Sequence, residues 1–175
     1  YGQARVILEY GSGGSTLVAA GLEGRTVFSV ESDAAWLRGM EGWFAAHPPR
    51  ADVRLHHADI GPTGRWGHPE GTAHCRHWPR YPVGVWERED FVAPDVVLID
   101  GRFRMACLLT VAFRTTRPVT VLFDDYGPRR HYHRVESFVP RRPELVGRMA
   151  VFDVAPTAIP LDRLSAVLAS FMVPA

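Results

Sequence analysis

The sequence contains no lysine, since all 20 of its basic residues are arginine. An arginine guanidinium stays protonated at ordinary pH, so the absence removes every lysine general base and every Schiff-base mechanism. Asp and Glu number 19, which leaves a net charge of only +1. Such a balanced chain has no overall field that would attract a polyanion. We therefore expect no nucleic-acid partner.

Cysteine is nearly absent as well. Cys75 and Cys107 are too few for the disulfide framework of a small secreted fold, so we expect a reducing, cytoplasmic compartment. His74 and His77 beside Cys75 suggest zinc, but no second Cys/His pair follows at the spacing that a four-ligand site needs. No run approaches the roughly 20 apolar residues of a membrane span, so we expect no membrane contact. Because the chain starts at Tyr1, just before the first expected strand, we also expect that sequence precedes it in the full protein.

What the 175 residues do contain is a regular alternation of short apolar runs and helix-like stretches. The expected strands lie at residues 5–9, 26–31, 52–59, 95–100 and 119–123. The expected helices lie at residues 15–20, 34–46, 105–113 and 130–139, followed by one or two strands within 145–154 and a helix at 161–171. This order predicts a single domain with an α/β fold, a Rossmann-like three-layer α/β/α sandwich around a mostly parallel sheet.

Residues 61–94 interrupt this rhythm with many Gly and Pro and with an aromatic set, Trp66, Trp78, Tyr81 and Trp86. The insertion follows the third expected strand, on the side of the sheet where ligands bind. It is therefore either a lid that excludes water or a loop fixed by its own aromatic core, and the two roles are compatible.

Carboxylates finish the expected strands: Glu9, Glu31, Asp59, Asp100 and the pair Asp124-Asp125. Ligands of open parallel sheets bind outside the carboxyl ends of the strands, so these acids are candidate binding groups. The alternative is that they cap helices, with Asp100 capping the one near residue 105 and the pair capping the one near residue 129.

The turn after the first strand is rich in glycine, which allows the backbone to bend sharply and approach a ligand closely. Glu31 lies 20 residues beyond Gly11, where a carboxylate can accept both ribose hydroxyls of an adenine nucleoside. Glu9 beside the turn suits a cation and repels the pyrophosphate of NAD. Thr16 also replaces the third glycine of the dinucleotide fingerprint.

The run Val6-Ile7-Leu8-Glu9-Tyr10-Gly11-Ser12-Gly13-Gly14 resembles the first motif of class I S-adenosylmethionine-dependent methyltransferases, and the resemblance covers roughly residues 5–139. It implies S-adenosylmethionine as cofactor and Glu31 as the ribose-binding acid, and it puts Asp59 and Ile60 at the adenine edge. The cofactor-binding residues that it implies are Glu9, Gly11, Ser12, Gly13, Ser15, Glu31, Ser32, Asp59, Ile60 and Asp100.

The runs Leu98-Ile99-Asp100-Gly101 and Phe123-Asp124-Asp125-Tyr126 are similar to metal-dependent O-methyltransferases, including the macrocin type. This resemblance implies that Asp100, Asp124 and Asp125 hold Mg²⁺, which would lower the pKa of the hydroxyl to be methylated. The lysine base of the catechol-type enzymes is absent here. Its place would be taken by Asp100, as the macrocin type suggests, or by His131 or His133, because histidine titrates near neutral pH.

Four arginines lie near these acids. Arg102, Arg104, Arg129 and Arg130 either bind an anionic substrate or form a solvated face.

The motifs together predict an enzyme that methylates a hydroxyl group of a small-molecule substrate. Two alternatives stay open. One is a protein that binds S-adenosylmethionine or S-adenosylhomocysteine without catalysis, which the missing lysine suggests. The other is a Rossmann enzyme that binds NAD or a nucleotide sugar.

Overall fold

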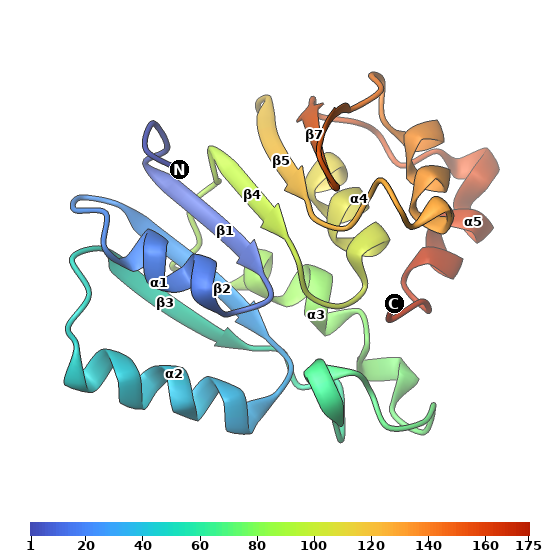
Figure 1. Cartoon of the computed structure of the whole chain (residues 1–175). Coiled ribbons are helices and arrows are strands. Elements are labelled where there is room, and N and C mark those ends of the chain that lie inside the picture. Colours follow the sequence, from blue (N-terminus) through green and yellow to red (C-terminus); the bar gives the residue numbers. More distant parts are fainter.

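A computed structural model describes residues 1–175, and a single twisted sheet runs through its centre (Figure 1). The seven strands lie in the order β3-β2-β1-β4-β5-β7-β6. Their bounds are β1 Val6–Tyr10, β2 Thr26–Glu31, β3 Asp52–His57, β4 Val96–Ile99, β5 Val119–Phe123, β6 Glu144–Val146 and β7 Met149–Val154. β1 to β5 pair in parallel, and β7 runs antiparallel to both of its neighbours. The predicted mostly parallel sheet is confirmed.

Helices cover both faces of the sheet, as the alternation predicts. α1 (Gly14–Ala20) and α2 (Ala34–Ala46) lie on one face, while α3 (Arg80–Val83), α4 (Arg104–Arg114) and α5 (Leu164–Ser170) lie on the other (Figure 1). Short 3-10 helices are η1 Arg65–Gly67, η2 Cys75–His77, η3 Gly84–Glu87, η4 Arg130–Phe138 and η5 Leu161–Arg163. None of the helices is long and apolar enough to cross a membrane.

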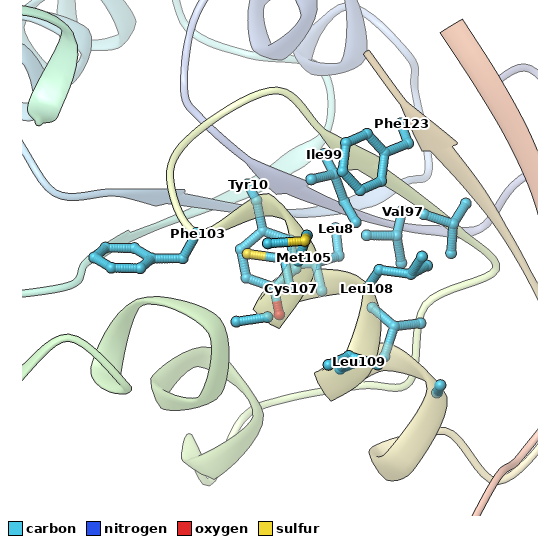
Figure 2. Packing of buried hydrophobic residues seen from close by; sticks show 14 of the residues in the cluster. Leu8, Tyr10, Val97, Ile99, Phe103, Met105, Cys107, Leu108, Leu109 and Phe123 are labelled. Carbon is cyan, nitrogen blue, oxygen red and sulfur yellow. The ribbon is translucent and has the colours of Figure 1, made fainter. Parts of the chain in front are cut away.

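The larger core lies between the sheet and α4. Alternate residues of the central strands, such as Leu8 on β1 and Ile99 on β4, point toward this face (Figure 2). Nine of the 11 residues of α4 are buried there, Leu108 and Leu109 among them. Residues of the opposite parity, such as Ile7, pack under α1 instead. All five residues of β1 are buried because a central parallel strand is covered on both faces.

Two expected elements differ in detail from the structure. Residues 130–138 form a 3-10 helix and not an α-helix. Its buried side chains, Tyr132 and Val135, are three residues apart, and this spacing lines up on one face when a helix has three residues per turn. The C-terminal helix expected at 161–171 is divided into η5 and α5. The strands expected within 145–154 are confirmed as the antiparallel pair β6 and β7.

The insertion at 61–94 holds α3 and three 3-10 helices that the sequence pattern did not reveal. Trp78, Tyr81 and Trp86 are buried in the main core, so these three rings fix the insertion to the domain. Trp66 is different, because it is 76% exposed and has a left-handed backbone with φ 63°. The insertion therefore has an aromatic core and, in addition, one ring at the surface.

The order in which consecutive strands are added to the sheet reverses between β1 and β4. β1 pairs with β2 on one side and with β4 on the other, so the turns that leave β1 and β4 diverge to opposite faces. Gly11, with φ 104°, lets the two turns approach, since a Cβ at this position would lie 2.8 Å from the Gly101 nitrogen. In open α/β sheets this crevice at the carboxyl ends is where ligands bind.

Candidate functional site

A cavity of about 590 Å³ opens at this crevice. Its lining residues are Gly11, Ser12, Gly13, Gly14, Ser15, Glu31, Asp33, Trp36, Trp66, Gly67, Tyr81, Asp100, Gly101, Arg102, Arg104 and Arg129. The structure thus brings six of the predicted cofactor-binding residues together, namely Gly11, Ser12, Gly13, Ser15, Glu31 and Asp100.

Glu31 is the last residue of β2, and the two oxygens of its carboxylate have different hydrogen-bond partners. Oε1 accepts hydrogen bonds from the backbone N–H groups of Ser32 (2.7 Å) and Asp33 (2.9 Å). Oε2 accepts only one long bond, from the Ser12 N–H at 3.3 Å. Asp33 caps α2 by accepting from two of its first N–H groups, so the residues around Glu31 are held rigidly. One oxygen of Glu31 therefore orients the side chain, and the other can accept hydroxyl groups of a ligand.

Ser32 does not line the cavity but links Glu31 to the insertion. Its Oγ donates to the Gly67 carbonyl oxygen at 3.0 Å. Gly67 packs so tightly that a Cβ would lie 2.7 Å from Ser32 Oγ and 3.0 Å from Glu31 Oε1, and its φ of 67° is a conformation that favours glycine. The insertion therefore closes directly over Glu31.

Glu9, a predicted cofactor-binding residue, lies behind the glycine turn and does not line the cavity. It is fully buried, and Tyr1 Oη donates to its Oε1 at 2.6 Å while Thr16 Oγ1 donates to its Oε2 at 2.5 Å. Burial raises the pKa of the Glu9 carboxyl. Thr16 Oγ1 also accepts the Gly13 N–H at 2.9 Å, so Glu9 supports the turn from within.

Three other predicted residues also lie outside the cavity. Ile60 is fully buried in the main core, where its apolar side chain is most stable. Asp59 is exposed, accepts the Gly61 N–H at 3.0 Å and lies 3.7 Å from Arg80. His131 is exposed on η4 with its ring against Tyr132, and partial desolvation of the ring together with the charge of Arg129 lowers its pKa. The cavity position of Asp100 leaves it as the predicted base that the geometry favours.

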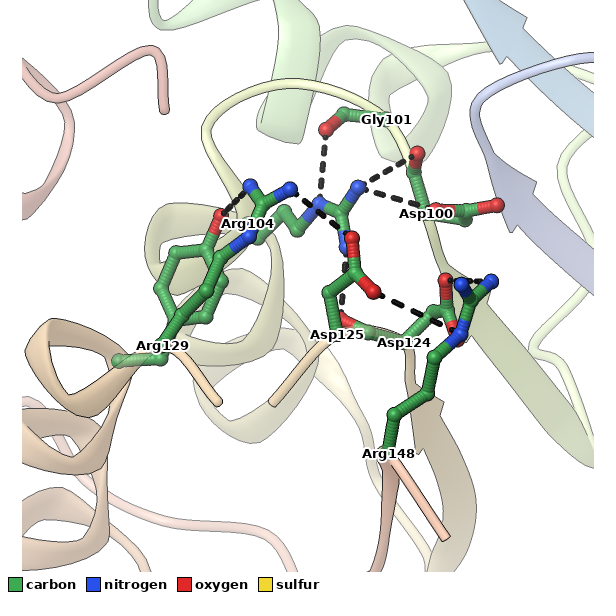
Figure 3. A network of polar contacts seen from close by, with 8 residues as sticks. Asp100, Gly101, Arg104, Asp124, Asp125, Arg129 and Arg148 are labelled. Atoms are coloured by element: carbon green, nitrogen blue, oxygen red, sulfur yellow. Dashed lines mark hydrogen bonds and ion pairs between the residues drawn. The ribbon is translucent and has the colours of Figure 1, made fainter. Parts of the chain in front are cut away.

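Asp100 lies at the end of β4, beside the almost fully buried Arg104. Arg104 Nη2 donates to Asp100 Oδ1 at 2.9 Å, and the same guanidinium donates to the carbonyl oxygens of Asp100, Gly101 and Asp124 (Figure 3). It thereby ties the ends of β4 and β5 together. Burial raises the pKa of the Asp100 carboxyl, and Asp124 and Asp125 add to this effect, while Arg104 opposes it.

The acidic pair after β5 is bound by arginines (Figure 3). Asp124 receives two hydrogen bonds from Arg148, Nε to Oδ1 at 3.0 Å and Nη2 to Oδ2 at 2.9 Å. Asp125 Oδ2 accepts from Arg129 Nη2 at 2.9 Å, and its Oδ1 lies 3.5 Å from Arg148 Nε. Each acid of the predicted metal site therefore has a guanidinium partner.

Neither the helix-capping role nor the metal role of these acids fits the geometry. Phe103 precedes α4 and Arg129 precedes η4, and no side-chain cap is formed at either helix. The structure contains no group of three or more His, Cys, Asp or Glu side chains arranged to hold a metal ion. Both oxygens of Asp124 and one oxygen each of Asp100 and Asp125 accept hydrogen bonds from arginine, so four of the six carboxylate oxygens that could bind Mg²⁺ are engaged.

The four arginines near the acids have different environments. Arg104 is structural, Arg129 pairs with Asp125, and Arg130 is exposed and does not line the cavity. Arg102 lines the cavity, and its buried Nε has no hydrogen-bond partner. Arg104 and Arg129 line the cavity too but are paired with aspartates, so Arg102 is the arginine that best fits the predicted anion-binding role.

Three aromatic residues line the cavity, and sequence reasoning placed two of them in the insertion on the ligand side of the sheet but missed Trp36. Trp36 is half exposed, and its Nε1 donates to the Ser12 carbonyl oxygen at 2.8 Å. Trp66 reaches the cavity from the insertion, and Tyr81 lies beneath Gly101, where any Cβ would collide with its hydroxyl group. The position of Trp36 in the first turn of the helix after Glu31 was a usable signal, and the place of the insertion after the third strand was the signal for Trp66.

No protein-family model matches the chain, and no curated protein is similar to it in sequence. Among solved structures, the methyltransferase-like protein from Silicibacter pomeroyi DSS-3 is 53% identical, with a TM-score of 0.95, and the match covers 99% of this chain and 90% of that one. The predicted O-methyltransferase Atu636 from Agrobacterium tumefaciens is 13% identical, with a TM-score of 0.50, over 96% of this chain and 90% of that one, and shows the fold alone.

The first of these similarities is decisive, because it joins high identity with coverage of nearly all of both chains. It agrees with the glycine turn at the end of β1, the acid at the end of β2 and the strand order of the sheet. The chain belongs to the methyltransferase-like family, and its sheet and crevice are those expected of the class I fold.

Proposed function

We propose that the protein is an S-adenosylmethionine-dependent methyltransferase that methylates a hydroxyl group of a small molecule. The observation that carries the proposal is the placement of Glu31 and Asp100 in one cavity, with a single oxygen of Glu31 fixed by Ser32 and Asp33 and a single oxygen of Asp100 fixed by Arg104. Glu31 would bind the cofactor ribose, and Asp100 would accept the proton of the substrate hydroxyl.

The charges of the cavity support this cofactor over NAD or a nucleotide sugar. S-adenosylmethionine carries an ammonium and a sulfonium, and the carboxylates of Glu31, Asp33 and Asp100 line the cavity. Three arginines line it as well, but two of them, Arg104 and Arg129, are paired with aspartates. A pyrophosphate instead needs free N–H groups at a helix N-terminus. The Gly13 N–H is already bound by Thr16, and the carboxyl of Glu9 lies behind the turn.

Asp100 supports catalysis over binding alone. When bound, S-adenosylmethionine supplies an electrophilic methyl group on its positively charged sulfur. The side chain of Asp100 is 47% exposed although Arg104 holds it in place, so a substrate hydroxyl can reach the carboxylate and give up its proton there. A carboxyl whose pKa is raised by burial is a stronger base than an ordinary aspartate. Asp100 can therefore replace the missing lysine.

Calorimetric titration with S-adenosylhomocysteine tests the cofactor, and release of S-adenosylhomocysteine in the presence of hydroxylated small molecules tests the reaction. We expect micromolar binding, and we expect Asp100→Asn to slow methyl transfer far more than it weakens binding. Tighter binding of NAD would contradict the cofactor assignment. Binding without turnover on any hydroxylated compound would favour the non-catalytic alternative.

A further inference from the structure

The three acids and three arginines at the ends of β4 and β5 balance in charge. Asp100, Asp124 and Asp125 contribute −3, and Arg104, Arg129 and Arg148 contribute +3. We infer that the guanidinium of Arg148 takes the place of a divalent metal ion at this acidic trio, so that the site excludes divalent cations and the proposed methyl transfer proceeds without one. The exclusion of metal does not depend on the proposed function, whereas the second part rests on it.

The first argument is the burial of Asp124. Its side chain is only 8% exposed, and a buried carboxylate is costly unless a cation and hydrogen bonds compensate it. Arg148 supplies both, with one hydrogen bond to each oxygen at 3.0 and 2.9 Å. Such two-point pairing is the strongest geometry between arginine and a carboxylate. Asp124 is therefore satisfied without a metal.

The second argument is the shared position of Arg148. Its Nε also lies 3.5 Å from Asp125 Oδ1. The hydrogen bond to Asp124 raises the pKa of Arg148, and the charges of Asp124, Asp125 and Asp100 add to this effect. One guanidinium thus pairs with both Asp124 and Asp125, as a single metal ion between them would.

The third argument is that the backbone fixes this placement. β7 pairs antiparallel with β5, with Phe123 opposite Ala150, so the register brings Arg148 beside the residues that follow β5. The Gly127 N–H donates to the Arg148 carbonyl oxygen at 3.0 Å, which anchors the start of β7 to the segment after the acidic pair. Arg148 therefore belongs to the site through the sheet and not through a chance surface contact.

A divalent ion would have to displace this arginine. Mg²⁺ is bound through oxygen atoms, and Arg148 engages both oxygens of Asp124 and faces one of Asp125. Without Arg148, the trio would carry −3 against +2 from Arg104 and Arg129, and the freed oxygens would face the space that the guanidinium had filled. Removal of Arg148 should thus create a cation site that the native protein lacks.

Titration with Mn²⁺, followed by electron paramagnetic resonance of the free ion, tests this inference on the full chain. We expect the native protein to bind no Mn²⁺ below millimolar concentration, and Arg148→Ala and Arg148→Gln to bind it at least tenfold more tightly. Asp124→Asn added to either variant should abolish the gain. Arg141→Ala is the matched control, because Arg141 also forms an exposed ion pair with an aspartate of β7, at 3.0 Å from Asp153.

Two results would overturn the inference. One is Mn²⁺ binding by the native protein that Asp124→Asn weakens, and the other is an affinity in both Arg148 variants no higher than in the native protein. The Gln variant retains a polar side chain of intermediate length, so a folding defect in the Ala variant would not prevent the test. Because Mn²⁺ binding is measured without cofactor or substrate, its outcome is independent of whether the protein methylates anything. Methyl transfer that a chelator abolishes would refute the second part alone.

Discussion

Replacement of Glu31 by Gln probes the cofactor site with the least change in shape. The carbonyl oxygen of Gln would take the place of Oε1, because Ser32 and Asp33 present N–H donors there. Its amide nitrogen would then face the cavity in place of Oε2. The first turn of α2 should therefore keep its structure, while the negative charge proposed to bind the ribose is lost.

The size of the effect follows from the hydrogen bonds that change. A hydrogen bond to a charged group contributes about 1.5–3 kcal/mol and a neutral one about 0.5–1.5, so each ribose hydroxyl should lose about 1–1.5 kcal/mol. For two hydroxyls the loss is about 2–3 kcal/mol, or roughly 30- to 150-fold in Kd.

Calorimetry with S-adenosylhomocysteine measures this change. Glu23→Gln is a suitable control, because Glu23 forms an exposed ion pair with Arg50 at 2.8 Å and does not line the cavity. It should bind as the native protein does. A folded Glu31→Gln variant, with native circular dichroism, that binds within twofold of the native protein would refute the assignment of Glu31 to the ribose.

Three further predictions concern the base, the rim and the support of the cavity. Asp100 must be deprotonated to act as a base, so the rate of methyl transfer should fall as the pH is lowered through the pKa of Asp100. Because burial raises that pKa, the fall should occur at a higher pH than for an ordinary aspartate. The pH profile measures this, and Asp100→Asn should lower the rate by about 10²- to 10⁴-fold and remove that limb. Trp66→Ala should weaken S-adenosylhomocysteine binding by about 3- to 10-fold through lost aromatic packing, whereas Trp66→Phe should bind almost normally. If fluorescence titration gave the same affinity for Trp66→Ala as for the native protein, the ring would have no role in binding. Arg104→Met should lower the free energy of unfolding by about 3 kcal/mol or more, because three backbone carbonyls lose a buried donor. Urea denaturation measures this change, with Arg130→Met as the control at an exposed position. An effect no larger than that of Arg130→Met would contradict the prediction.

The residues at the strand ends could be predicted from the sequence. Runs of buried β-branched and aliphatic residues identify parallel strands, and the carboxyl ends of such strands lie at one edge of the sheet. This is why Gly11, Glu31 and Asp100 could be placed in one site before any coordinates. Their positions depend on local pattern and on chain direction, which the sequence displays.

The hydrogen-bond and ion-pair partners of the acids could not be predicted in the same way. Glu9 looks like a cofactor ligand until the hydroxyl groups of Tyr1 and Thr16 are seen to enclose it. Arg148 is 24 residues from Asp124, and their contact depends on the antiparallel register of β5 and β7. A pattern of charges along the chain does not reveal which opposite charges meet in space.

The tight packing of Gly67 on Glu31 makes the insertion a structural part of the pocket. Any side chain at position 67 would have to displace Ser32 Oγ or Glu31 Oε1, so a substitution 36 residues after Glu31 would act as a pocket mutation. In a random mutant library, changes at Gly67 should therefore fall in the same phenotypic class as changes at Glu31. Changes at Gly71, a few residues along the same insertion, should strain the backbone at its φ of 73° without reaching the pocket, because a Cβ there would meet open space.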